Sequence, residues 1–481
     1  MSGVKVMKQD LFKEFEIKGY WWLPGITDKE VSGILFYKSD TIRLEIIGVL
    51  SNDLFDENIE EKTIFGYSEK GEEITLINAF STNFTLNSPG YSTETYVIES
   101  FVVGGHLKSI DDMSIHSLAI YPTYFSKWSG KGIFSQEYSI KDEVVDKRKQ
   151  INFDEPKLFN EYVESIGANI EETYYATLNM DIFEKVDWVY NGGVKITPNE
   201  WKDFGWFMDI LFKTRDLYTL FIGYPVYFRN VIFYGEEYSV GDSFQRKKYS
   251  FFIQQKEMKL KENFKWHDTM ISYKDVQGNF GEILNAWFGK QKSLKTVLDL
   301  HLSDFYKDVY LETKFLNAVQ ALEIYHRKFF DGKVFDETVY QEYTRKILTY
   351  VQKEMSEEFK NKIMGMLQHG NEYSLSKRIR ELINKNLDAE TKSYLFGNSN
   401  NRSKFIQQIV DTRNFLTHYD QSGKKNVLVG IEIYYAVQRL KALTTVIIFK
   451  EICMEEGTIL RKIQDNKKSA YAINKSRKLL N

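Results

Sequence analysis

The sequence predicts an α+β multidomain fold, in which a β-rich N-terminal region is followed by an all-α helical bundle. Hydrophobic residues make up 43% of the 481 residues and aromatic residues 15%, so the chain carries enough apolar surface to build folded cores. Short apolar or alternating runs fill the first part of the chain, whereas longer runs with helical spacing fill the second part. Because this periodicity changes near residue 285, we expect one domain over residues 1–285 and another over residues 286–481.

The N-terminal region is predicted to form a sandwich or a barrel, with a mixed α/β middle. Six runs of strand length lie between turn residues, and glycines fall near the ends of many of them. These runs cover residues 15–24, 31–38, 41–49, 73–78, 96–103 and 114–121. Further along, apolar spacing predicts a helix within residues 199–222, and residues 224–234 again have the pattern of a strand.

The C-terminal region is predicted to consist of long helices. The clearest spans residues 311–330, because apolar residues such as Phe315, Val319 and Leu322 recur at intervals of three or four. Asp331 then begins a turn that ends it. The spacing predicts further helices over residues 337–353, 357–368, 374–387, 403–419 and 427–454, of which the last is one helix or two.

Charge is distributed unevenly along the chain. Residues 1–300 hold 34 basic and 45 acidic residues, whereas residues 401–481 hold 15 basic and 7 acidic ones. A polyanion such as RNA would therefore prefer the C-terminal end. A lysine-rich helical surface that is simply solvated would have the same composition, so charge alone does not decide between the two.

Several kinds of chemistry lack the residues that they need. A single cysteine, Cys453, cannot form a disulfide framework or a cysteine-based zinc site, and its apolar helical surroundings predict that it is buried. The seven histidines include no pair at helical spacing and no His-Glu-x-x-His segment. No segment has the glycine and lysine spacing of a phosphate-binding P-loop. We therefore expect neither a metal nor another cofactor.

Nothing in the sequence indicates export or membrane insertion. The first residues are not followed by the apolar stretch of a secretory signal, because Asp10 and Lys13 interrupt it. The most apolar late stretch, residues 427–449, is broken by Glu432 and Arg439, and so falls short of the roughly 18 consecutive apolar residues that a membrane span needs. These features, together with the single cysteine, predict a cytoplasmic protein without a membrane partner.

A short segment near the C-terminus combines the side chains that RNA cleavage requires. Arg413, Asn414 and His418 lie within residues 411–420, late in a helical pattern. Arginine carries a permanent charge and planar donors that suit phosphate, and histidine can exchange a proton near neutral pH. In metal-free RNA cleavage the 2′-hydroxyl loses a proton as it attacks phosphorus, and the leaving 5′-oxygen gains one. Charge meanwhile builds on the non-bridging oxygens.

Helical geometry constrains how this segment can work. At about 100° per residue, Arg413 and His418 project roughly 140° apart, whereas Asn414 and His418 share one face. One straight helix therefore does not bring the arginine and the histidine together. Either the helix end is distorted, or a second copy of the segment supplies the missing partner across a dimer interface.

The two ends of the chain resemble known families. The six residues from Arg413 to His418 resemble the Arg-polar-x3-His signature of HEPN ribonucleases, and residues 312–330 resemble the first half of a HEPN bundle. At the other end, residues 19–24, 33–36 and 44–48 are similar to the N-terminal domain of ApeA-type anti-phage proteins. The resemblance implies a β-rich sensing or regulatory region fused to a HEPN ribonuclease that halts translation or growth of an infected bacterium.

The resemblance also implies roles for individual residues and partners. Arg413 and His418 correspond to the catalytic pair and Asn414 to a positioning residue, while Glu323 on an earlier helix is a weaker candidate. The expected substrate is RNA, and by family analogy tRNA, because single-stranded loops allow the in-line attack that this reaction needs. The resemblance further implies a homodimer or larger homo-oligomer, with a phage protein as its trigger.

Two other functions remain open at this point. The helical domain could be a non-catalytic dimer that binds RNA or a nucleotide, with His418 serving only as a polar residue at a helix end. Alternatively, the β-rich region could be a receptor for a phage or glycan ligand, with the helices as a scaffold. The aromatic residues Tyr20, Trp21 and Trp22 could then stack on a ligand, but we expect them to pack in a core. His326 is likewise expected to be a packed helix residue.

Overall fold

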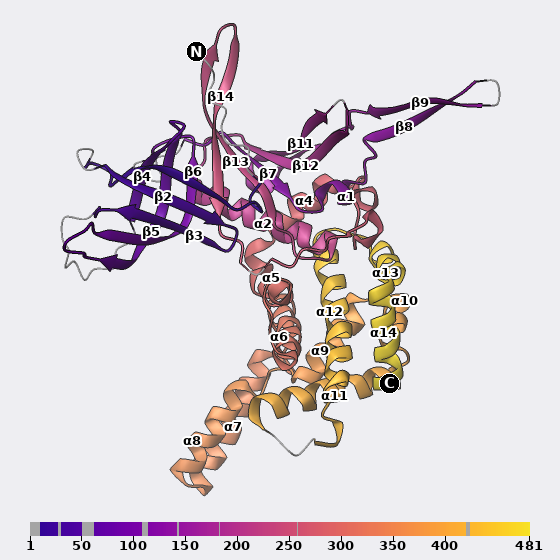
Figure 1. The fold of residues 1–481 in the computed structure, drawn as a ribbon. Coiled ribbons are helices and arrows are strands. Elements are labelled where there is room, and N and C mark those ends of the chain that lie inside the picture. The colour runs from indigo at the N-terminus through magenta and orange to yellow at the C-terminus, as the bar shows by residue number, and fades with distance from the viewer. Residues whose placement is uncertain are drawn as a thin grey trace. The chain divides into compact units, whose positions relative to one another are not determined.

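The structure is a computed structural model, and it describes residues 10–26, 30–50, 62–107, 114–141, 144–181, 183–256, 258–419 and 424–481. The chain divides into two compact units, Met1–Phe288 and Gly289–Asn481. The first unit contains the strands, and the second is built from helices (Figure 1). The predicted α+β class, with β structure preceding a helical bundle, is therefore confirmed.

Six strands of the first unit close into an antiparallel barrel (Figure 1). Around the barrel, each strand pairs with the next: β1 (Phe15–Trp22), β2 (Val31–Lys38), β3 (Thr41–Ile47), β6 (Thr93–Val103), β5 (Glu73–Thr85) and β4 (Lys62–Ser68), which returns to β1. Alternate residues face the interior, as strand geometry requires. On β3, for example, Ile42 and Leu44 are completely buried, whereas Arg43 between them is exposed.

The aromatic cluster of β1 belongs mainly to this core. Trp21 is completely buried and lies opposite Gly66 of β4, where an added Cβ would come within 2.4 Å of the indole ring. Glycine is thus the residue that lets the indole approach the neighbouring strand this closely. Trp22 is also buried, but Tyr20 is 56% exposed. The expectation of core packing is confirmed for the two tryptophans and wrong for Tyr20.

The sheet continues beyond the barrel from β14, which pairs with β6. The added antiparallel strands, in spatial order, are β14 (Ser243–Ile253), β13 (Phe228–Val240), β7 (Ser117–Pro122), β12 (Lys185–Pro198), β11 (Ala168–Asp181) and β10 (Asn160–Val163). A separate hairpin comprises β8 (Phe134–Lys141) and β9 (Val144–Phe153). The sequence pattern predicted only β7 and part of β13 among these strands.

One long helix and three short ones accompany this sheet. They are α2 (Phe204–Ile222), α1 (Phe125–Ser129), α3 (Tyr273–Val276) and α4 (Phe280–Gly289). The predicted helix α2 begins where the Asp203 side chain accepts a hydrogen bond from the Trp206 backbone N–H at 2.7 Å, which satisfies an otherwise unpaired donor. It ends at Gly223, whose φ of 74° is readily adopted only by glycine.

The second unit is a bundle of ten helices within the part of the chain that is described. They are α5 (Gln291–Tyr306), α6 (Leu311–Phe329), α7 (Glu337–Glu354), α8 (Glu357–His369), α9 (Leu375–Asn386), α10 (Ala389–Phe396), α11 (Ser399–His418), α12 (Ile431–Glu451), α13 (Glu456–Asp465) and α14 (Lys467–Leu480). Helix α12 packs against α6 and α14 and contributes many buried residues to the core. Among the described residues, no helix combines the length and apolarity that crossing a membrane would need.

The end of α12 corrects one expectation. Residues 427–454 were predicted to form one or two helices, and a single helix ends at Glu451. Cys453 lies after that end in a left-handed conformation, with φ of 65°, and it is exposed rather than buried. The apolar residues before it predicted burial, and its neighbours Ile452 and Met454 are buried, but the left-handed turn leaves the Cys453 side chain in solvent.

His301 of α5 makes the stability of the bundle depend on pH. Only 5% of this residue is exposed, and burial, together with the nearby charge of Lys441, lowers its pKa to about 3. In the unfolded chain a histidine titrates near 6.5, so below that pH the unfolded state binds a proton that the folded state does not. The contribution of neutral His301 to the free energy of unfolding is therefore fully present above pH 6.5, and it is lost progressively as the pH falls toward 3.

We predict that lowering the pH from 7.5 to 5 costs the wild type about 2 kcal/mol more unfolding free energy than it costs His301→Gln. Urea denaturation followed by far-UV circular dichroism at the two pH values measures this difference. Equal losses in the two proteins would show that His301 is protonated in the folded bundle.

Candidate active site

Helix α11 carries the Arg413–His418 segment at its C-terminal end. The helix begins where the Asn398 side chain accepts a hydrogen bond from the Asn401 backbone N–H at 2.9 Å. Phe405, Ile406 and Ile409 are completely buried and anchor one face of the helix in the bundle. The last turn emerges from this core, so Arg413 is half-buried and His418 is exposed.

Two of the candidate residues contact the Arg413 side chain. Its guanidinium donates a hydrogen bond from Nη1 to Oδ1 of Asn414 at 3.1 Å. Its Nη2 lies 3.9 Å from Oε2 of Glu323, which projects from α6. The structure thus brings Arg413, Asn414 and Glu323 together, and α6 packs against α11 to do so (Figure 1). These two contacts orient part of the guanidinium and leave its other N–H donors available to a phosphate.

Glu323 is itself held by a chain of charged residues from α6, from the segment between α8 and α9, and from α9. Its Oε1 accepts hydrogen bonds from Nε and Nη2 of Arg327, one turn later, at 3.3 and 3.2 Å. Arg327 also bonds to Glu372, which in turn lies 3.1 Å from Nη2 of Arg378. These arginines lower the pKa of Glu372, so its carboxylate remains charged and can hold both of them.

His326 ends this network inside the bundle and has a defined tautomer. Nη1 of Arg378 lies 3.0 Å from its Nδ1, and Oε2 of Glu381 lies 2.7 Å from its Nε2. Because a guanidinium can only donate, Nδ1 must accept and Nε2–H must donate to the carboxylate. Burial lowers the pKa of His326, although Glu381 opposes this shift. The expectation that His326 is a packed helix residue is confirmed, and its polar partners were not foreseen.

The chain that follows α11 returns to the same helix. The Leu428 backbone N–H donates to Oγ1 of the buried Thr412 at 2.9 Å, and the Asn426 side chain donates to Oδ2 of Asp411 at 2.8 Å. Both acceptors directly precede Arg413 in the sequence. The hydrogen bonds therefore fix the returning segment against the helix turn that carries the candidate arginine.

His418 does not lie on the same side of α11 as Arg413. The helix is regular through His418, and Tyr419, with φ of 53°, is the first residue outside it. The sequence left open whether the end of this helix is distorted. The first departure from helical geometry is at Tyr419, after the motif and not within it. At about 100° per residue, Arg413 and His418 project roughly 140° apart, so the structure joins the arginine to Glu323 and Asn414 but leaves the histidine on another face.

Sequence reasoning missed the residues that support Glu323. Arg327 is four residues after Glu323, a spacing that predicts an ion pair on a helix surface. Glu372 lies between α8 and α9, and Arg378 lies on α9. No local sequence pattern connects either residue to α6. Among the described residues, no group of three or more histidine, cysteine or carboxylate side chains is placed to hold a metal ion.

The helical unit belongs to a known class of domain. A family model described as Apea-like HEPN matches residues 316–458, which contain all four candidate residues. The helical unit is therefore a HEPN domain, and domains of this class are usually ribonucleases.

The first unit identifies the family. A model described as ApeA N-terminal domain 1 matches residues 16–287, which is more than half of the chain. The chain belongs to the ApeA family, as an ApeA-type anti-phage defence protein with a C-terminal HEPN domain. No curated protein and no solved structure is similar enough to the chain to count as a match.

We predict that Thr412→Val loosens the returning segment, because the Leu428 N–H loses its buried acceptor. An unsatisfied buried donor costs about 1–3 kcal/mol, and the Leu428 amide should exchange hydrogen faster in this variant. Hydrogen exchange measured by mass spectrometry tests this, with Thr412→Ser, which keeps the hydroxyl, as the control. The account of this contact fails if Leu428 is equally protected in the wild type and in Thr412→Val.

Proposed function

We propose that the HEPN domain is a metal-independent endoribonuclease that acts in anti-phage defence. The observation that carries this proposal is the arrangement at the end of α11, where Arg413 is held by Glu323 and Asn414 while part of its guanidinium remains available. An exposed histidine, His418, ends the same helix. A permanent planar cation and an exposed imidazole are the groups that RNA transesterification uses in the absence of a metal.

Each residue has a role in the proposed reaction. His418 acts as the general acid or base, and Arg413 stabilises the charge that builds on the non-bridging phosphate oxygens. A bond forms between the 2′-oxygen and phosphorus, and the bond from phosphorus to the 5′-oxygen breaks. The proton of the 2′-hydroxyl passes to a base, and the leaving 5′-oxygen receives a proton. The products carry 2′,3′-cyclic phosphate and 5′-hydroxyl ends. Asn414 and Glu323 position the guanidinium.

The proposed active form is a homodimer. Because α11 is regular through His418, Arg413 and His418 of one chain project in different directions. A second copy of the segment, related by a two-fold axis, would place the His418 side chain of one protomer beside Arg413 of its partner. HEPN domains often dimerise, and the symmetric arrangement would produce two equivalent centres.

The proposed substrate is tRNA, cut in a single-stranded loop. Such loops expose the in-line geometry that attack by the 2′-hydroxyl needs, whereas a base-paired helix restrains it. The excess of basic residues over residues 401–481 would favour a polyanionic substrate. We also propose that the β-rich unit senses a phage component, which would then activate cleavage.

We predict that Arg413→Ala and His418→Ala each lower RNA cleavage by at least about a hundredfold, which is typical for the loss of charge stabilisation or general acid–base catalysis. Purified proteins would be incubated with total bacterial RNA in EDTA, with and without infected-cell extract, and the fragment ends would be mapped. Arg345→Ala and His267→Ala change exposed residues outside residues 401–481 and outside the charged network around Glu323, so they serve as matched controls and should retain activity.

Two outcomes would contradict the proposal. Undiminished cleavage by folded Arg413→Ala or His418→Ala would assign these residues a structural role. Cleavage that EDTA abolishes, or that leaves 5′-phosphate ends, would exclude the metal-independent mechanism. A wild type that binds RNA but does not cleave it, even with the extract, would favour a non-catalytic RNA-binding dimer.

A further inference from the structure

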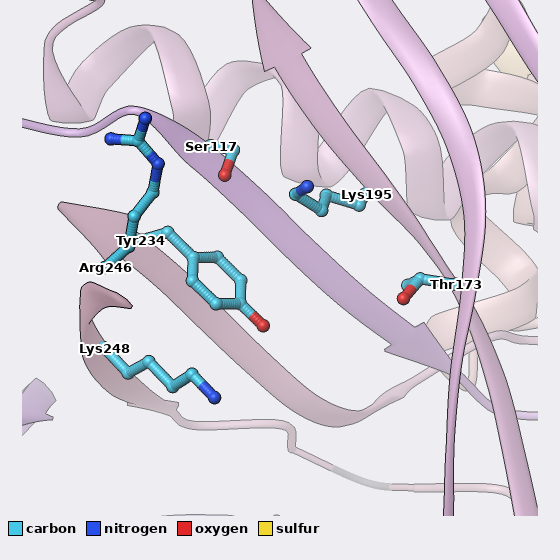
Figure 2. A pocket seen from close by; sticks show the side chains of 6 residues that line it. All are labelled: Ser117, Thr173, Lys195, Tyr234, Arg246 and Lys248. Carbon is cyan, nitrogen blue, oxygen red and sulfur yellow. The ribbon is translucent and has the colours of Figure 1, made fainter. Parts of the chain in front are cut away.

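A pocket in the first unit gathers cationic and hydroxyl side chains from five adjacent strands. The residues that line it are Ser117, Thr173, Lys195, Tyr234, Arg246 and Lys248, and we call it the β-sheet pocket (Figure 2). The strands that contribute are β11, β12, β7, β13 and β14, which are neighbours in this order. The pocket lies outside the closed barrel and outside the HEPN domain.

The strand register places these side chains on one face of the sheet. Residues that pair directly in an antiparallel sheet point to the same side, as do residues two apart on one strand. Tyr234 pairs with Ser117 on one neighbour and with Lys248 on the other. Arg246 is two residues from Lys248 and shares its side.

The same rule places Lys195 and Thr173, at the other end of the pocket, on this face of the sheet. Lys195 pairs with Ala119 of β7 and with Glu171 of β11. Ser117 is two residues from Ala119, and Thr173 is two residues from Glu171. The whole row therefore projects from one face, so that a single ligand can contact several strands at once.

The positive charge of the pocket is only partly neutralised. Lys195 is ion-paired with Glu171 at 2.9 Å, and Arg246 lies 4.0 Å from Glu237. Lys248 makes no ion pair with any residue that the structure describes, and its ammonium lies 5.8 Å from the centre of the Tyr234 ring. Three cations thus face two carboxylates, and the surplus charge lies at the Tyr234 end of the pocket.

Neighbouring titratable groups respond to this environment. Burial and then the charges of Arg246 and Lys195 lower the pKa of His116, which precedes Ser117 on the chain. Burial also raises the pKa of Tyr234, so its hydroxyl stays protonated and can donate to an anion. The pocket therefore presents a positive field together with hydroxyl donors, which is a combination that suits phosphate oxygens.

We propose that the β-sheet pocket binds a small ligand that carries two linked phosphate groups and has the size of a nucleoside diphosphate. Its volume of about 340 Å³ lies at the lower end of the roughly 300–1,000 Å³ found for small-molecule sites. A single phosphate group offers three terminal oxygens, fewer than the six donor side chains around the pocket. Two linked phosphates offer more acceptor oxygens to these donors, which come from five neighbouring strands. This site is separate from the proposed ribonuclease centre, so neither proposal depends on the other.

The test is isothermal titration calorimetry of the full-length protein with ADP, pyrophosphate and orthophosphate as probes. We predict that ADP and pyrophosphate bind with Kd of about 1 mM or tighter, and that orthophosphate binds at least about tenfold more weakly. The double variant Arg246→Gln/Lys248→Gln should weaken ADP binding by at least about tenfold, because it removes two charge-assisted contacts. Both side chains reach solvent, and circular dichroism would confirm that the variant is folded.

The matched control is Arg43→Gln/Lys185→Gln, which makes the same change of charge at two exposed strand residues outside the pocket. Its affinity for ADP should stay within about twofold of the wild type. The proposal is overturned if the wild type binds neither ADP nor pyrophosphate, or if the pocket and control variants weaken binding equally. Equal affinity for orthophosphate would refute the requirement for two phosphates. Pocket-dependent binding of a short single-stranded RNA, without binding of ADP, would replace the proposed ligand with RNA.

Discussion

The backbone hydrogen bonds of α11 run regularly to its last residue, and this regularity constrains the whole ribonuclease proposal. A regular helix separates side chains five residues apart by roughly 140°, so Arg413 and His418 cannot meet on one straight helix. Tyr419 adopts a left-handed conformation only after the motif has ended. The buried residues Phe405, Ile406 and Ile409 hold the helix in the bundle, and the hydrogen bond from Leu428 to Thr412 fixes the chain beside its last turns. Together these contacts oppose any local unwinding that would bring the two side chains together.

The position of Arg413 depends in turn on a charged network that crosses the bundle. Glu323 lies between Arg327 and Arg413, and the network continues through Glu372 to Arg378, which is 3% exposed. Removing these charges from water is costly, and the cost is offset only where every donor and acceptor is paired. Arg378 meets this requirement through Glu372, His326 and the backbone oxygen of Tyr373. A network of this kind can hold Glu323 in place while the arginine beside it remains accessible.

The sequence was informative where packing is local and uninformative where it depends on the arrangement of distant elements. Helix α6 could be predicted because Phe315, Val319 and Leu322 form a stripe at helical spacing, and the motif at the end of α11 could be found from its residue types alone. The contact between Glu323 and Arg413 requires α6 and α11 to pack side by side, which no local pattern specifies. Strand β9 was missed because its sequence is rich in charged residues, which strand propensities disfavour. The β-sheet pocket depends on the register of five strands, and long-range register cannot be read from spacing within any one of them.

The most direct test of the central claim, that two chains form each catalytic centre, is to mix Arg413→Ala with His418→Ala under conditions that allow protomers to exchange. In a mixed dimer one centre would lack both residues and the other would be intact. If protomers combine at random, cleavage should therefore return to about a quarter of the wild-type rate, although each variant alone is inactive. No recovery, with exchange verified by native mass spectrometry, would show that each centre takes both residues from one chain and would contradict the account.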